Sequence, residues 1–154
     1  MYPFATLNKT ATAIFQHIIS LPKNAGSGDY MYWKLHNSEI SCYMDLVVEK
    51  LGSCSLMGKI WDSYSFAHYY KQNGDSMRDP EMCFLYNEEL KEVIPYMFCM
   101  DGIFSRYEES IQIGDETYSP RLQKAHTAFA NKWMKNINEQ QELGVKIPRA
   151  KVTA

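Results

Sequence analysis

Apolar residues recur at three- and four-residue steps near the N-terminus, which predicts a helix over about residues 7–21. Five of them would share one face: Leu7, Ala11, Ile14, Phe15 and Ile18. Pro22 should end this helix, because proline lacks the backbone donor and clashes with the preceding turn. The turn-forming residues 23–29 then predict a loop that leads into the next part of the chain.

From residue 30 to about residue 107, short runs of β-forming residues are separated by polar turns, which is typical of an antiparallel meander. We predict five or six strands and one further short strand: 30–36, 42–51, 54–61, 64–71, 81–86, 94–100 and 103–107. Leu46 and Val48 alternate with Val47 and Glu49, so one face of the second strand is apolar and the other is mixed. This alternation predicts a sheet with helices packed on one face.

Ser119 followed by Pro120 predicts the start of a second helix, because serine caps free amides and proline fits the first helical position. An apolar stripe follows, and Gly144 provides a stop after Leu143. The stripe consists of Leu122, Ala125, Phe129, Trp133 and Ile137. The predicted fold is a single α+β domain over residues 1–144, with an antiparallel sheet flanked by an N-terminal and a C-terminal helix. Residues 145–154 are predicted to form a flexible basic tail.

Composition narrows the function classes. The chain has 154 residues, of which 45% are hydrophobic and 22% charged, as in ordinary globular domains. A net charge of −2 gives no general attraction to phosphate backbones, which argues against direct nucleic-acid binding. Four cysteines without a Cys-x-x-Cys pair argue against a zinc knuckle. Without a leader or a long apolar run, we expect a cytoplasmic protein and no membrane partner.

The densest polar information lies in residues 68–82. Asn73-Gly74 is a strong hairpin signal, because both residues adopt positive φ at little cost. A cation site built from Asp75, Asp79 and Glu81 near His68 lacks the ligand spacing of a calcium loop. We favour a structural role in which polar side chains bond loop amides, and we predict no metal and no cofactor.

A functional surface, if this segment carries one, should use side chains that a hairpin loop presents without disturbing the core. Six residues are the candidates: Tyr70, Gln72, Asn73, Asp75, Arg78 and Asp79. We assign no catalytic residue among them.

Several short segments between residues 40 and 110 resemble a known family: 44–49, 68–75, 77–82, and Asp101 with Gly102 and Ile103. The specific parts are Gln-Asn-Gly-Asp at 72–75 and Asp-Pro-Glu-Met at 79–82. They look like a domain of unknown function carried by bacteriophages, plasmids and conjugative elements, sometimes within large polyvalent proteins. The resemblance implies a mobile-element accessory protein, and such genes often travel with functions that counter restriction or CRISPR immunity. It brings no established catalytic residues.

Three functions compete. The leading hypothesis is a non-enzymatic inhibitor that binds a host defence protein or nuclease complex, with an acidic surface that mimics nucleic acid. The acidic residues of 88–116 would supply it: Glu88, Glu89, Glu92, Asp101, Glu108, Glu109, Asp115 and Glu116. The second is a small hydrolase or nucleotide-processing enzyme that uses His68 with Asp75, Asp79 or Asp101. The third is a structural docking module or homodimer that associates through a sheet edge or an aromatic patch.

Overall fold

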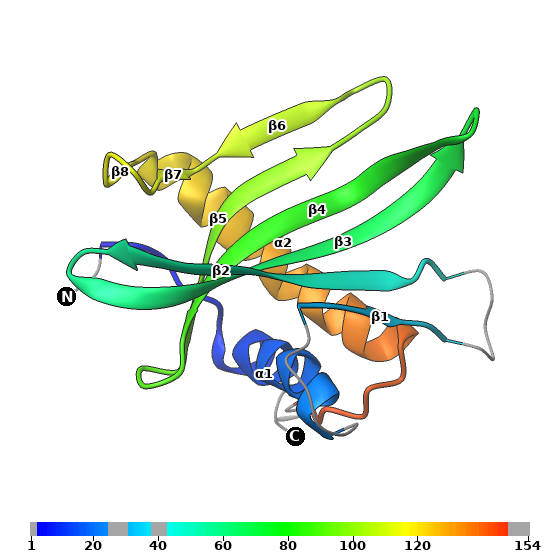
Figure 1. Cartoon of the computed structure of the whole chain (residues 1–154), viewed down its shortest axis with the longest axis horizontal. Helices are drawn as coiled ribbons and strands as arrows, with labels where there is room; N and C mark the ends of the chain where they lie inside the picture. Colours follow the sequence, from blue (N-terminus) through cyan, green and yellow to red (C-terminus); the bar gives the residue numbers. More distant parts are fainter. Residues whose placement is uncertain (1–2, 25–30, 38–42, 148–154) are drawn as a thin grey trace, which may run out of the picture.

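The computed structural model of the chain describes residues 3–24, 31–37 and 43–147. An N-terminal helix, a six-stranded antiparallel sheet and a C-terminal helix follow one another along the chain (Figure 1). This confirms the predicted α+β class. No helix in the described part of the chain has the length and hydrophobicity needed to cross a membrane.

The first helix, α1, spans Lys9–Asn24. Asn8 caps it, since its Oδ1 accepts the N–H of Ala11 at 2.8 Å, so the helix starts two residues later than predicted. The prediction that Pro22 ends the helix was wrong, because the helix continues to Asn24. Pro22 lies in the last turn, where it removes one hydrogen bond near an end that already lacks several.

The large sheet is a meander in which every strand pairs antiparallel with the next one in sequence. Its strands are β1 Tyr32–Leu35, β2 Leu46–Leu56, β3 Lys59–Gln72, β4 Asp75–Asn87, β5 Glu92–Met100 and β6 Arg106–Glu109. A separate small hairpin joins β7 Ile111–Gln112 to β8 Thr117–Tyr118.

Several strand boundaries differ from the prediction. The expected break after residue 51 is a bulge at Gly52, whose φ is +117°, and β2 continues to Leu56. The turn comes at Met57 and Gly58, both with positive φ, so the expected second break at 62–63 lies inside β3. Similarly, β4 begins at Asp75 and includes the stretch 75–80 that we had assigned to a loop. The last predicted strand, 103–107, is replaced by β6 at Arg106–Glu109.

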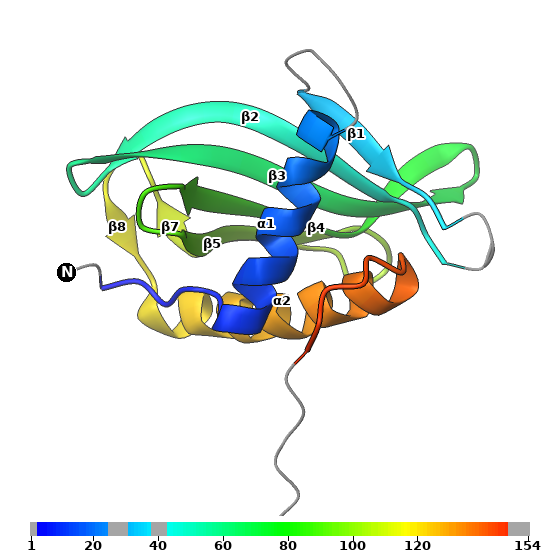
Figure 2. The same cartoon turned by 90° about the horizontal axis from the view of Figure 1, so that it is seen from below.

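Both helices pack on the same face of the large sheet, as Figure 2 shows. Leu46 and Val48 point into this interface, which confirms the predicted apolar face of the second strand. Phe15 of α1 lies at its centre, stacked on Phe66 with 4.8 Å between ring centroids and edge-on to Phe84. The aromatic residues of the sheet therefore anchor α1.

A second apolar cluster lies on the opposite face, at the end of the sheet covered by β7 and β8. Leu85 belongs to it because strand neighbours alternate, and Phe84 points to the helices. Trp61 is fully buried there and donates its indole N–H to the Leu56 carbonyl at 3.3 Å. Among the described residues, no helix covers the rest of that face.

The second helix, α2, spans Pro120–Gln140, and Ser119 caps it as predicted by accepting the N–H of Leu122. It ends three residues before Leu143. The predicted apolar stripe was partly wrong, since Ala125 and Phe129 are exposed whereas Gln123, His126 and Thr127 are buried. Polar residues occupy the inner face because each one finds a hydrogen-bond partner there.

Gln123 joins the two ends of the fold. Its amide donates to the Ala5 carbonyl at 2.8 Å and to the Pro95 carbonyl at 3.3 Å, and its Oε1 accepts the Ala5 N–H at 2.7 Å. At the other end of α2, Asn138 holds Val145 through two hydrogen bonds. The start of the predicted tail is therefore attached to α2, and residues 148–154 of that tail lie outside the described residues.

Candidate functional site

Two loops that are distant in sequence meet at one end of the large sheet (Figure 1). One is the β3–β4 tip, and the other is the β5–β6 loop that follows Met100. Adjoining hollows of about 350 and 390 Å³ lie between them. We call this surface the two-hairpin end, and its residues are Tyr70, Gln72, Asn73, Asp75, Met77, Met100, Asp101, Gly102, Ile103 and Phe104. It brings four of the six predicted candidates together.

The β3–β4 tip is a two-residue turn in which Asn73 has φ +53° and Gly74 has φ +87°. Both angles are those of a hairpin turn with positive φ at its two central residues, which confirms the Asn73-Gly74 prediction. Gln72 pairs with Asp75 across the turn, and all of these side chains are exposed. The tip therefore presents polar groups on a tight two-residue turn.

Tyr70 and Gly102 fix the distance between the two loops. Gly102 has φ +113°, and a Cβ added there would lie 3.2 Å from the hydroxyl oxygen of Tyr70. Only glycine meets both requirements without displacing the tyrosine. The β5–β6 loop is thus seated directly against β3.

Beyond Gly102, the β5–β6 loop turns two large apolar side chains outward. Ile103 is 93% exposed and Phe104 is 86% exposed. Exposed apolar residues are common singly, but two consecutive ones on a loop, beside a polar hairpin tip, form a site where burial would release free energy. Such residues are typical anchors of protein–protein contacts.

Arg78 binds Asp101 and so ties β4 to the end of β5. Its Nε donates to Asp101 Oδ2 at 2.9 Å and its Nη2 donates to Oδ1 at 3.0 Å. This two-pronged contact holds the pKa of the Asp101 carboxyl below its ordinary value. Arg78 also approaches Glu81, which accepts the hydroxyl of Ser65. The predicted candidate Arg78 therefore supports the two-hairpin end from the side and is not part of its exposed surface.

Asp79, the remaining candidate, lies across from His68 where the pairing of β3 and β4 is irregular. His68 is buried, donates its Nδ1–H to the Asp45 carbonyl at 2.9 Å and packs edge-on to Trp133. Burial lowers the pKa of His68, although the Asp45 hydrogen bond and the Asp79 charge oppose that shift. The imidazole thus has the environment of a core residue.

The three carboxylates proposed to act with His68 do not gather around it. Asp75 lies at the exposed hairpin tip, Asp101 is bound by Arg78, and of the proposed carboxylates only Asp79 lies opposite His68. Among the described residues, no three His, Cys, Asp or Glu side chains are placed to hold a metal ion. The described cysteines, Cys54, Cys83 and Cys99, are free thiols, and burial raises the pKa of Cys83 to about 12.

Sequence reasoning missed a hydrogen-bonded chain of Ser110, His126 and Glu108. His126 Nε2 donates to Glu108 Oε1 at 3.0 Å, and its Nδ1 shares a hydrogen bond with the Ser110 hydroxyl at 3.0 Å. Arg106 also donates to Glu108, which together with His126 lowers the pKa of that carboxyl. The residue types resemble a nucleophile, base and acid, but Ser110 has no exposed surface. A substrate cannot reach the Ser110 hydroxyl. These hydrogen bonds therefore serve to hold α2 against the sheet.

The acidic residues of 88–116 do not form one patch. They lie in the β4–β5 turn, at the start of β5, just after β5, on β6 and in the β7–β8 turn. Asp101 and Glu108 are bound by Arg78 and Arg106. Glu116 accepts the N–H of Met57. The remaining carboxylates are thus distributed over several turns and strands of the described structure.

Fold and site together define an α+β protein with a six-stranded meander, two helices on one face and an exposed polar and apolar surface at one end. The chain belongs to a family described as a domain of unknown function, DUF6908, whose profile matches residues 12–143. The match includes both helical regions and therefore extends well beyond the expected 40–110. No curated protein and no solved structure matches the chain.

Proposed function

We propose that this protein is a non-enzymatic binding module that attaches to a partner protein through the two-hairpin end. The observation that carries the proposal is the near-complete exposure of Ile103 and Phe104 beside the polar turn at Asn73. Interfaces commonly place a few bulky anchors at the centre and polar groups around them. Ile103 and Phe104 supply the anchors, and Gln72 and Asp75 supply polar groups at the margin.

The contacts that hold this surface in place favour a binding role over a catalytic one. Gly102 is seated on Tyr70, and Asp101 is held by Arg78 through a two-pronged contact. A loop that is fixed before binding loses less conformational entropy when a partner docks. By contrast, His68 and Ser110, the groups that resemble catalytic ones, are buried.

The partner class is proposed from the resemblance to proteins of phages, plasmids and conjugative elements. It makes a host defence complex, such as a CRISPR effector or a restriction nuclease, the partner to test first. Because the acidic side chains are dispersed, we propose that apolar anchors, more than imitation of nucleic acid, provide the affinity. The protein would then act in the cytoplasm of the host cell.

The test measures binding of the purified protein to a panel of defence nucleases, together with their cleavage of DNA. We expect one complex to be bound and inhibited, and we expect Phe104→Asp or Ile103→Asp to weaken binding about tenfold or more. Ile60→Asp is the matched control, since Ile60 is 66% exposed in the β2–β3 hairpin, away from the site. Loss of binding by the control as well would contradict the assigned surface.

Two other outcomes separate the alternatives. Absence of binding to every nuclease in the panel would remove the inhibitor proposal. Concentration-dependent mass in light scattering, lost with Phe104→Asp, would instead assign the two-hairpin end to a homodimer.

A further inference from the structure

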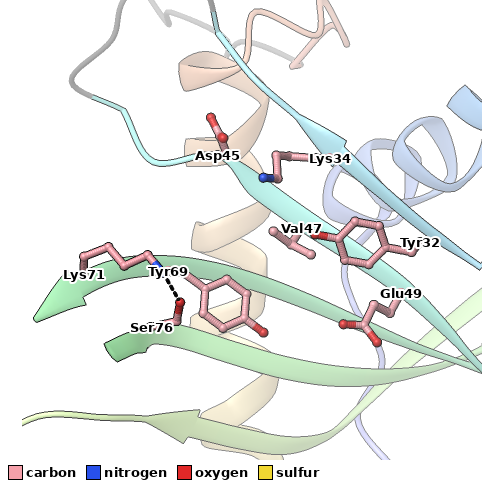
Figure 3. Close-up of a pocket in the computed structure, with 8 residues that line it drawn as sticks. All are labelled: Tyr32, Lys34, Asp45, Val47, Glu49, Tyr69, Lys71 and Ser76. Atoms are coloured by element: carbon pink, nitrogen blue, oxygen red, sulfur yellow. Dashed lines mark hydrogen bonds between the residues drawn. The ribbon is translucent and has the colours of Figure 1, made fainter. Parts of the chain in front are cut away.

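The face of the sheet opposite the two helices carries a hollow of about 480 Å³ over β1 to β4 (Figure 3). We call it the open-face hollow, and eight residues line it: Tyr32, Lys34, Asp45, Val47, Glu49, Tyr69, Lys71 and Ser76. It is separate from the two-hairpin end. Tyr69 and Lys71 alternate with Tyr70 and Gln72 along β3, so the two pairs of side chains point to opposite faces of the sheet. Its volume is within the roughly 300–1,000 Å³ typical of small-molecule sites.

The centre of the hollow is apolar. Val47 is buried on β2, and tyrosine rings flank it from the two neighbouring strands, Tyr32 from β1 and Tyr69 from β3. Tyr32 is 54% exposed even though it is a large aromatic residue on a strand. Such rings offer flat faces on which a planar group can stack.

One end of the hollow attracts cations. Glu49 pairs with Tyr32 in the β1–β2 ladder, so the two side chains project from the same face. Burial raises the pKa of Tyr69, and the charges of Glu81 and Glu49 add to that effect, whereas Arg78 opposes it. A carboxylate beside aromatic rings is a recognised arrangement for binding a guanidinium or ammonium group.

The other end attracts anions. Lys34 pairs with Val47 and lies two residues from Tyr32 on β1, about 7 Å along the strand. Lys71 approaches from β3, where its amine donates to the Ser76 hydroxyl at 2.8 Å. The nearby Asp45 carboxylate is already engaged by His36. Positive charge therefore predominates at this end.

The charges at the two ends are not satisfied by one another. Within the described part of the chain, the Lys34 amine and the Glu49 carboxylate make no hydrogen bond or ion pair. Figure 3 shows their charged groups apart, with Val47 and Tyr32 between them. A ligand with a complementary charge at each end would engage both.

We propose that the open-face hollow binds a bipolar ligand, with a guanidinium at the Glu49 end and a carboxylate at the Lys34 end. Arginine has this chemistry, either as the free amino acid or as the carboxy-terminal residue of a peptide. Guanidinium is favoured over ammonium because its planar group stacks on tyrosine rings while donating to a carboxylate. This inference does not depend on the proposed docking function.

The experiment follows amide shifts by NMR while the full chain is titrated with three probes. They are free arginine, agmatine, which lacks the carboxylate, and an acetylated tripeptide that ends in arginine. We expect shifts around Tyr32 and Tyr69, with agmatine binding about tenfold more weakly than arginine because one charge-assisted contact is missing. The tighter of arginine and the tripeptide identifies the source of the ligand, and either result supports the site.

Variants test the two ends separately. Lys34→Met should weaken arginine about tenfold without changing agmatine, whereas Glu49→Gln should weaken both probes. The matched controls, Lys59→Met and Glu89→Gln, remove exposed charges at hairpin turns outside the hollow. Equal binding of arginine and agmatine, or no shift with any probe, would overturn the proposal.

Discussion

Arg78 and Asp101 bind each other through their main chains as well as their side chains. The Arg78 N–H donates to Asp101 Oδ2 at 2.8 Å, and the Asp101 N–H donates to the Arg78 carbonyl at 3.0 Å. The aspartate therefore extends the pairing of β4 and β5 beyond the regular ladder, which begins at the pair Glu81 and Cys99. The β5–β6 loop starts from this fixed point.

Asp101→Asn should lower the free energy of unfolding by about 1–2 kcal/mol. The amide keeps the size of the side chain but loses the charge and one of the oxygens that accept from Arg78, and partial exposure of both groups limits the cost. Urea unfolding measures the change. Glu109→Gln is the control, because its carboxylate is exposed and accepts only from the Tyr107 hydroxyl among the described contacts. An equal cost in both variants would contradict a special role for the pair.

Acid should remove the stabilisation that the Asp101 carboxylate provides through its contact with Arg78. Because the Arg78 contact holds the pKa of Asp101 below its ordinary 3.8, the stabilisation is complete above that value and is lost as the pH falls through the lower folded-state pKa. Wild type and Asp101→Asn should therefore differ most above about pH 4 and converge in stronger acid. Thermal unfolding of both proteins over this range provides the measurement. If the difference in stability between wild type and Asp101→Asn did not change with pH, the charge of the carboxylate would not contribute to stability.

His68 should remain neutral at pH values where an exposed histidine is charged. Its pKa lies below the ordinary 6.5, so its contribution to stability is complete above 6.5 and declines as the pH falls toward the folded-state pKa. In His68→Asn the side-chain amide can still donate to the Asp45 carbonyl, but this pH dependence should disappear. Urea unfolding from about pH 7.5 to about pH 5.5 would show it. NMR titration of the ring to a pKa above 6.5 would contradict the argument.

Gly102→Ala should destabilise the protein by about 1–2 kcal/mol, because alanine is strained at positive φ and its Cβ would press on the Tyr70 hydroxyl. Gly52→Ala is the matched control, since Gly52 has nearly the same φ (+117° against +113°) but has nothing within 4 Å of an added Cβ. The Gly102 variant should cost more than the control in wild type and the same in a Tyr70→Phe background. If both variants lost the same stability when Tyr70 is present, the Tyr70 side chain would be able to move aside without loss of stability.

The local signals in the sequence predicted the fold class because they act over a few residues. Ser119-Pro120 and Asn73-Gly74 determine a helix start and a turn by their own backbone preferences, and both formed as expected. The break predicted after residue 51 was wrong because Gly52, with positive φ, forms a bulge within β2 and not a turn. Distinguishing the two requires the register of the partner strand.

The site was harder to predict because its parts come from different strands. The turn at Asn73 indicated one half, but its partner surface at Ile103 and Phe104 is defined only when β3 and β5 are placed in one sheet. His126 was missed for a related reason. A polar residue is expected outside, and only Ser110 and Glu108, which lie 16 and 18 positions away in sequence, make its burial favourable.

The contact between Gln123 and Ala5 has a consequence for the order in which the protein folds during synthesis. The two residues are 118 positions apart, whereas each pair of neighbouring strands in the large sheet is consecutive in sequence. Strand pairing can therefore proceed while the ribosome is still adding the later strands. The main chain of Ala5, however, can bond to Gln123 only once the start of α2 has emerged. Until then the aromatic face of the nascent sheet is only half covered. A chaperone would therefore bind the chain during this interval.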